Sequence, residues 1–125
     1  MSRSWNNVVL VKFELKANDL PIGYDINFMT SDRLIDENLS CKEVIFLSER
    51  LSQNIDLILL DLKNLPLKGG SDCLVHCAYT NKTPIFGVGE KDDLKRFPRY
   101  AELVLSIHPT ITEAIDHFKR HYIKF

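Results

Sequence analysis

The sequence predicts one α/β domain in which helices cover both faces of a five-stranded, mostly parallel sheet. Two observations predict this class. Short apolar runs without polar alternation recur along the 125-residue chain, and segments with helical periodicity separate them. Unbroken apolar runs are typical of strands buried on both faces, and alternating strands and helices are typical of parallel sheets with right-handed crossovers. No linker, repeat or low-complexity tract divides the pattern, so we expect a single domain over residues 1–125.

The first half of the chain predicts two strands and one well-marked helix. The strands are expected over residues 8–13 and 24–30. Between them, residues 14–23 are too few and too rich in helix breakers for a full crossover helix, which we expect to be absent or reduced. Residues 31–38 could form a helical turn or a loop. Ser40 and Glu43 have the spacing of a capping box and predict a helix over about 40–53.

The second half predicts three further strands and three helices. The strands are expected over residues 55–60, 84–89 and 101–107. Two short helices are expected over residues 72–79 and 92–97, the second started by Asp92 or Asp93 and limited by Pro98. Thr110 and Glu113 repeat the capping-box spacing and begin a final helix, along which apolar side chains form one stripe.

Composition excludes several classes of protein. The formal charge of −1 gives no general attraction to nucleic acid or to an anionic membrane. No apolar run approaches the roughly 20 residues that span a bilayer, and the N-terminal residues lack the layout of a signal peptide. The sequence has only three cysteines, and this small, odd number argues against a disulfide framework. We therefore expect a cytoplasmic protein that does not enter membranes.

Two of the cysteines, Cys73 and Cys77, flank His76 on one predicted helix. Such a cluster could contribute to a metal site, but a tetrahedral site needs further ligands, and the sequence contains no second Cys/His cluster. The alternative is that both thiols are small buried hydrophobic groups on one helical face. We favour this alternative and expect neither a metal nor a cofactor.

Three polar or special residues stand at the ends of predicted strands. Asp61, Gly89 and His108 each follow a buried apolar run. In parallel α/β sheets, ligands and reactive groups lie at the carboxyl ends of the strands, so we expect these three residues to lie at one edge. Asp61 could be a reactive carboxylate there, or only the first polar residue after a buried strand.

Residues 40–123 resemble the receiver domain of response regulators. The stretch DLILLDLKNLP is similar to the third strand and loop of that family, TPIFGVGEKDD to its fourth strand, and ELVLSIHPTITEAIDHF to its fifth strand and last helix. The resemblance implies a flavodoxin-like three-layer sandwich. It also implies that Asp61 occupies the position of the phosphoacceptor, whose chemistry needs a magnesium ion held by carboxylates at the end of the first strand.

The chain departs from the receiver pattern at the other working positions. Lys12 and Phe13 stand where the family has its acidic pair, and Gly89 replaces the hydroxyl-bearing residue after strand four. His108, followed by a proline, replaces the lysine of strand five. We therefore expect a degenerate, phosphorylation-independent receiver without catalytic residues, in which Asp61 is a structural strand-end carboxylate. Two alternatives remain: phosphoacceptor activity at Asp61, and a proton switch at His108.

Without phosphoryl transfer, the expected function is signalling through protein contacts. Receiver domains signal through the fourth helix, fifth strand and last helix, where this chain combines cations with aromatic residues. The expected interface residues are Lys95, Arg96, Phe97, Arg99, Tyr100, Arg120 and Tyr122. Arginine and aromatic residues are frequent in interface hot spots, so we expect a partner protein or a homodimer. No recognition motif for nucleic acid accompanies the cations.

Two other functions are kept as alternatives. The stretch SDCLVHCAYTNKTPIFGVG also resembles the helix and strand of nucleoside deoxyribosyltransferase-like enzymes, but His76 stands where that family has its catalytic glutamate. We therefore do not expect an enzyme. The last alternative is a small nucleotide-binding module that uses Gly69, Gly70 and Ser71 at the N-terminus of a helix.

Overall fold

The structure is a computed structural model that describes residues 6–13, 26–36 and 38–122. Its described strands form one sheet in the order β2-β1-β3-β4-β5, and every pairing is parallel. The strands are β1 (Asn6–Val11), β2 (Ile26–Thr30), β3 (Leu57–Asp61), β4 (Ile85–Val88) and β5 (Ser106–His108). This order confirms the predicted fold class, a flavodoxin-like α/β sandwich.

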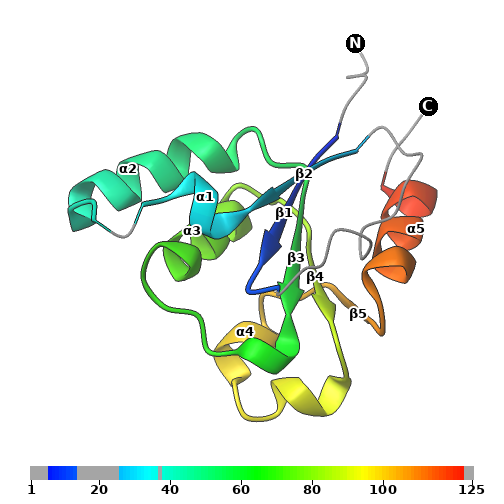
Figure 1. Ribbon diagram of the computed structural model, residues 1–125. Helices are drawn as coiled ribbons and strands as arrows, with labels where there is room; N and C mark the ends of the chain where they lie inside the picture. Colours follow the sequence, from blue (N-terminus) through cyan, green and yellow to red (C-terminus); the bar gives the residue numbers. More distant parts are fainter. Residues whose placement is uncertain (1–5, 14–25, 37, 123–125) are drawn as a thin grey trace.

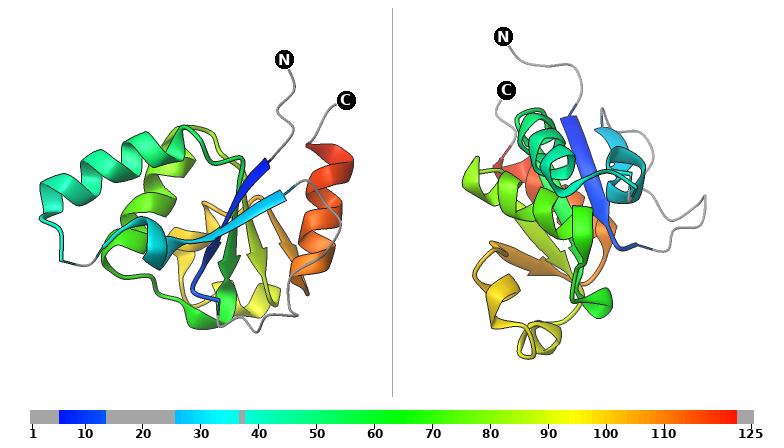
Figure 2. Two further views of the ribbon diagram at one scale, coloured as in Figure 1. Left: turned by 45° about the horizontal axis from the view of Figure 1, so that its top comes forward. Right: turned by 90° about the vertical axis from the view of Figure 1, so that its left-hand side faces the viewer.

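Helices cover both faces of the sheet. The α-helices are α1 (Ser31–Leu34), α2 (Cys41–Ser52), α3 (Gly69–Thr80), α4 (Pro98–Ala101) and α5 (Ile111–His121), and two 3₁₀ turns are η1 (Leu62–Asn64) and η2 (Lys91–Leu94). Figure 1 shows α2 and α3 on one side of the sheet and α5 on the other. The two views of Figure 2 show that these elements form three layers.

The core is divided by the sheet into two halves, and strand alternation assigns side chains to each. Ile58 and Leu60 of β3 face the half beneath α3, whereas Leu57 and Leu59 face the half beneath α5. All four are fully buried. The absence of polar alternation in this strand therefore has the expected cause, namely that protein covers both of its faces.

The helix starts predicted at Ser40 and Thr110 are confirmed, whereas α3 begins at Gly69 and not at Asp72 as predicted. Ser40 Oγ accepts a hydrogen bond from the backbone N–H of Glu43, and the Glu43 carboxylate accepts one from the N–H of Ser40. Thr110 Oγ1 likewise accepts from the N–H of Glu113 at the start of α5. Each bond satisfies a backbone donor that has no partner within its helix.

The region between β4 and α5 differs from expectation. The predicted strand over 101–107 is wrong in its first half, because β5 comprises only Ser106–His108. Pro98 does not limit a helix but occupies the first turn of α4, where its missing N–H costs no hydrogen bond. The start of η2 is capped at Glu90, whose N–H donates to Asp93 Oδ2 at 2.9 Å.

The expected loss of the first crossover helix concerns residues 14–23, which lie outside the described residues. In the part of the chain that the structure describes, no helix combines the length and the apolar character needed to cross a bilayer.

Candidate functional site

Asp61 is the last residue of β3, and its carboxylate caps the turn that follows. Its Oδ1 accepts a hydrogen bond from the backbone N–H of Lys63 at 3.1 Å. Its Oδ2 accepts from the side-chain amide of Asn64 at 2.9 Å. Both carboxylate oxygens are therefore engaged within the same loop, which is the geometry of a structural strand-end aspartate.

The environment of Asp61 does not resemble that of a metal-bound carboxylate. Partial burial raises the pKa of Asp61 above its ordinary value. The bonds from Lys63 and Asn64 and the charge of Lys63 oppose this rise, while the carboxylate of Asp93 adds to it. Among the described residues, no group of three or more histidine, cysteine or acidic side chains could hold a metal ion.

Lys12 lies next to Asp61 because Val11 pairs with Leu60 in the parallel register of β1 and β3. Its backbone is left-handed, with φ of 68°, and its carbonyl oxygen accepts from Asn64 Nδ2 at 2.8 Å. The side chain of Lys12 is exposed. The position at which the receiver resemblance requires a carboxylate therefore carries a lysine in a backbone conformation that few non-glycine residues adopt.

Gly89 follows β4 and leaves no room for a larger residue. Its φ is 144°, and its N–H donates to the carbonyl oxygen of His108 at 2.9 Å. A Cβ at this position would lie 2.9 Å from Asp93 Oδ2 and 3.1 Å from Leu62 Cβ. A hydroxyl-bearing side chain at this position would therefore be strained.

His108 ends β5, but its ring contacts groups other than Asp61. The ring lies against Phe86 and His117, with ring centroids 5.4 and 4.7 Å away. Its Nε2 is 2.8 Å from Ser106 Oγ. Burial, and then the neighbouring His117, lower the pKa of His108. The three strand ends share one edge of the sheet, yet the side chains of Asp61 and His108 have different partners.

A groove of about 1300 Å³ opens beside this edge, where the strand order turns from β1 to β3. Its lining includes Lys12, Lys63 and Lys68, the start of α3 at Gly69–Ser71, and the ring of Phe13. In open parallel sheets, ligands bind where the strand order reverses in this way. The groove is formed at the carboxyl ends of β1 and β3.

The lining of the groove combines cations with apolar groups. Among the described residues the lining includes three lysines and one carboxylate, that of Asp36, and apolar side chains in and around α2 and α3 complete the wall. At the start of α3, backbone N–H groups lack partners within the helix and carry partial positive charge. The balance of charge therefore favours an anionic ligand with an apolar part.

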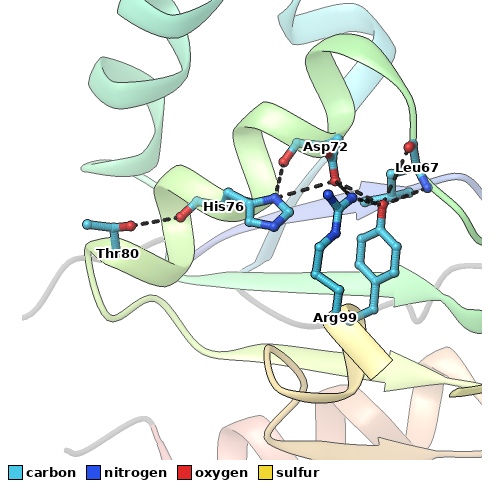
Figure 3. A network of polar contacts seen from close by, with 6 residues as sticks. Leu67, Asp72, His76, Thr80 and Arg99 are labelled. Carbon is cyan, nitrogen blue, oxygen red and sulfur yellow. Dashed lines mark hydrogen bonds and ion pairs between the residues drawn. The ribbon is translucent and has the colours of Figure 1, made fainter. Parts of the chain in front are cut away.

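A second hollow of about 590 Å³ lies between α2, α3 and α4, and a polar network borders it. Asp72 Oδ1 accepts from Arg99 and from the hydroxyl of Tyr100, each at 2.9 Å (Figure 3). The Tyr100 hydroxyl also accepts from the N–H of Leu67 at 3.0 Å. His76 Nδ1 lies 2.8 Å from the carbonyl oxygen of Asp72. The network links α4 to the start of α3.

Cys73, His76 and Cys77 line this second hollow. Burial, followed by the neighbouring Cys73, raises the pKa of Cys77 to about 11. Such a thiol is protonated at neutral pH and is a poor metal ligand or nucleophile. His76 does not line the groove at the carboxyl edge, so it does not stand where a substrate bound there would need a catalytic group.

The expected interface residues do not form one exposed face. Tyr100 is only 2% exposed, and Phe97 packs against the core. Arg99 binds Asp72 and lies over the Tyr100 ring. Lys95 pairs with Asp92 at 2.9 Å on the surface. Exposed side chains that remain near β5 and α5 are Arg96, Leu105, Arg120 and Tyr122.

Comparisons with known proteins do not assign the chain to a family. The chain matches no protein-family model, no curated protein and no solved structure. The candidate site therefore rests on its own geometry.

Several residues of the site carry no signal that sequence reasoning could use alone. Asn64 and Asp93 act on Asp61 through loop geometry, and the stretches that contain them gave no sign of this contact. His117 and His121 do have a signal, namely helical i, i+4 spacing shortly after the strand that ends in His108.

Proposed function

We propose that this chain is a binding module that does not carry out phosphoryl transfer, and that its ligand is a phosphate-bearing small molecule of nucleotide size. The observation that carries the proposal is the groove of about 1300 Å³ at the turn of the strand order. Ligand pockets of proteins commonly have volumes of about 300–1,000 Å³. An open groove of this size can take a nucleotide.

The charges around the groove support the phosphate. Lys12 follows β1, whereas Lys63 and Lys68 lie in the connection between β3 and α3, and Asp36 is the only acidic residue among the described residues of the wall. A phosphate bound among them would also face the first N–H groups of α3. Phe13 and the apolar wall would contact the base or another apolar part of the ligand. The three lysines would repel a magnesium ion, so we do not expect the groove to bind one.

Isothermal titration with adenosine, guanosine, cytidine and uridine 5′-monophosphates tests the proposal, each beside its nucleoside. We expect at least one nucleotide to bind and its nucleoside to bind at least tenfold more weakly. Lys68→Glu should weaken binding, whereas Lys91→Glu, which changes an exposed lysine of η2 outside the groove, should not. Equal binding of nucleotide and nucleoside, or no binding by any of the eight compounds, would reject the proposal.

A second candidate is the degenerate receiver-like signalling domain that acts through protein contacts. It is supported by the capped state of Asp61 and by apolar side chains exposed at the β5 edge, with Leu105 63% and Tyr122 41% exposed. Arg120 lies in α5, whose C-cap is Tyr122, and its side chain is exposed. Such a surface suits a partner protein or a second copy.

Sedimentation equilibrium tests the homodimer form of this candidate. We expect the wild-type chain to associate, and expect Leu105→Lys and Arg120→Glu each to shift it toward monomer. High salt should weaken the effect of Arg120 if it is electrostatic. A wild-type monomer at high protein concentration would leave only a partner of different sequence.

The free thiols of Cys41, Cys73 and Cys77 fit the reducing compartment, the cytoplasm, that we propose for the protein.

The deoxyribosyltransferase-like alternative has no comparable support. His76, at the position of that family's catalytic glutamate, lines the smaller hollow and is bonded to Asp72. Of the acidic residues that the structure describes, Asp36 is the only one that lines the groove. Incubation with nucleosides and measurement of free base would detect such an activity, and we expect none.

A further inference from the structure

Three histidines from β5 and α5 form a cluster outside the groove and outside the Asp61 loop. The ring of His117 lies 4.7 Å from that of His108 and 4.7 Å from that of His121, between ring centroids. His108 and His117 are half-buried, and His121 is exposed. The cluster joins the last strand of the sheet to the C-terminal helix.

The histidines cover an apolar ring of the core. Phe86 of β4 is fully buried, and its ring centroid lies 5.4 Å from that of His108 and 5.5 Å from that of His117. Phe118 and Tyr122 of α5 and its C-cap contact the same ring, at 6.4 and 5.2 Å. Neutral imidazoles suit this position because they pack against aromatic faces with little loss of hydration.

We propose that this cluster couples the docking of α5 to pH, so that the C-terminal half of the helix packs on the sheet at neutral pH and loosens as the pH falls. Histidine changes its charge between about pH 5 and 8. When two adjacent rings are both protonated, like charges stand side by side over an apolar core. Both the repulsion and the cost of burying the charges are relieved when the helix moves away.

The charged groups around the cluster do not cancel this effect. Glu113 of α5 is the carboxylate that acts on His108, and it favours the charged form. Burial and His117 act in the opposite direction and lower the pKa of His108. Asp116, Lys119 and Arg120 are the remaining charged residues of α5 near His117 in the sequence, and Asp116 and Lys119 each have an interaction partner. Strands β4 and β5 contribute no acidic or basic group besides His108, and β3 contributes only Asp61 at its end.

The sign of the effect follows from His108. Its pKa is lower in the folded protein than in the unfolded chain, so the unfolded chain binds the proton more readily. Stability is then complete above the unfolded pKa of about 6.5 and is lost as the pH falls through that value toward the folded pKa. The loss is expected first in α5, because α5 supplies two of the three rings.

Hydrogen exchange tests the proposal at pH 7.5 and pH 5.5, with protection factors corrected for the intrinsic rate at each pH. In the wild-type chain we expect protection of residues 114–121 to fall by about tenfold. Protection of β3 should fall much less. Parallel losses in α5 and β3 would overturn the proposal without any variant.

Substitutions assign the effect to the cluster. His117→Gln should reduce the pH-dependent loss in α5, because it removes the second cause, after burial, of the lowered pKa of His108. His76→Gln, which changes the remaining histidine outside the cluster, should leave the loss unchanged. If His117→Gln proves too unstable, His121→Gln removes an exposed member of the same cluster and should reduce the loss. An unchanged pH dependence in the folded cluster variants would also overturn the proposal.

Discussion

The side-chain amide of Asn64 donates to the carboxylate of Asp61 at 2.9 Å, and through its second hydrogen to the carbonyl oxygen of Lys12 at 2.8 Å. One residue thus ties the end of β3 to the end of β1. In this arrangement Asp61 holds the loops at the carboxyl edge together. The same bonds occupy an oxygen that a phosphoacceptor would present to its donor.

The first prediction concerns phosphoryl transfer to Asp61. With acetyl phosphate and magnesium, we expect no phosphorylated protein, because Lys12 stands where the ion would need a carboxylate and Asp61 is bonded to Lys63 and Asn64. Intact-mass spectrometry provides the measurement. A stoichiometric phosphoryl adduct in the wild-type chain that is absent in Asp61→Asn would contradict this prediction.

The second prediction concerns Gly89. Gly89→Ser places a hydroxyl where receiver domains carry one, yet we expect it to destabilise the fold by roughly 1–3 kcal/mol. The backbone φ of 144° disfavours any side chain, and the new Cβ would meet Asp93 Oδ2. Urea denaturation followed by circular dichroism measures the change. A serine variant as stable as wild type would show that the loop relaxes at no cost.

The third prediction separates Arg99 from Arg96. Arg99→Glu should lower the free energy of unfolding, because it removes an ion pair and places a carboxylate beside Asp72. Arg96→Glu, on the exposed end of the same segment, should change it by less than about 0.5 kcal/mol. Thermal denaturation of both variants decides the matter. Equal melting temperatures of the two variants would contradict the prediction that the contacts among Arg99, Asp72 and Tyr100 stabilise the fold.

The fourth prediction concerns two buried serines on α2. Ser48 is fully buried, and its hydroxyl finds no hydrogen-bond partner among the described residues. Ser48→Ala should therefore stabilise the protein by about 1 kcal/mol, since it removes an unsatisfied polar group and improves helix propensity. Ser52 is a matched control, because its hydroxyl donates to Glu49 O at 2.9 Å and accepts from Asn81.

Ser52→Ala should consequently destabilise the protein by about 1 kcal/mol. Denaturant titration of both variants gives the comparison. If the two substitutions change stability in the same direction, the hydrogen-bonding difference between Ser48 and Ser52 does not determine their effects.

The sequence by itself determined the features that depend on neighbouring residues. The capping-box spacing at Ser40 and at Thr110 and the unbroken apolar run of β3 predicted their elements, because a cap or a buried strand is specified within a few residues. Alternation of these elements then implied a parallel sheet, and the observed order agrees. The position of Asp61 at a strand end followed from the same local pattern.

Only the tertiary structure decided which side chains meet. Arg99 and Tyr100 looked like surface residues in the sequence, but both bind Asp72, which lies 27 and 28 positions away. Arg99 thereby connects α4 to α3, and Tyr100 is buried. The register places His108 level with Asp61 across β4, yet the His108 ring lies against Phe86 and Asp61 binds Lys63 and Asn64. Such pairings depend on the register of strands and on how short helices dock, and both are set by contacts between segments far apart in the chain.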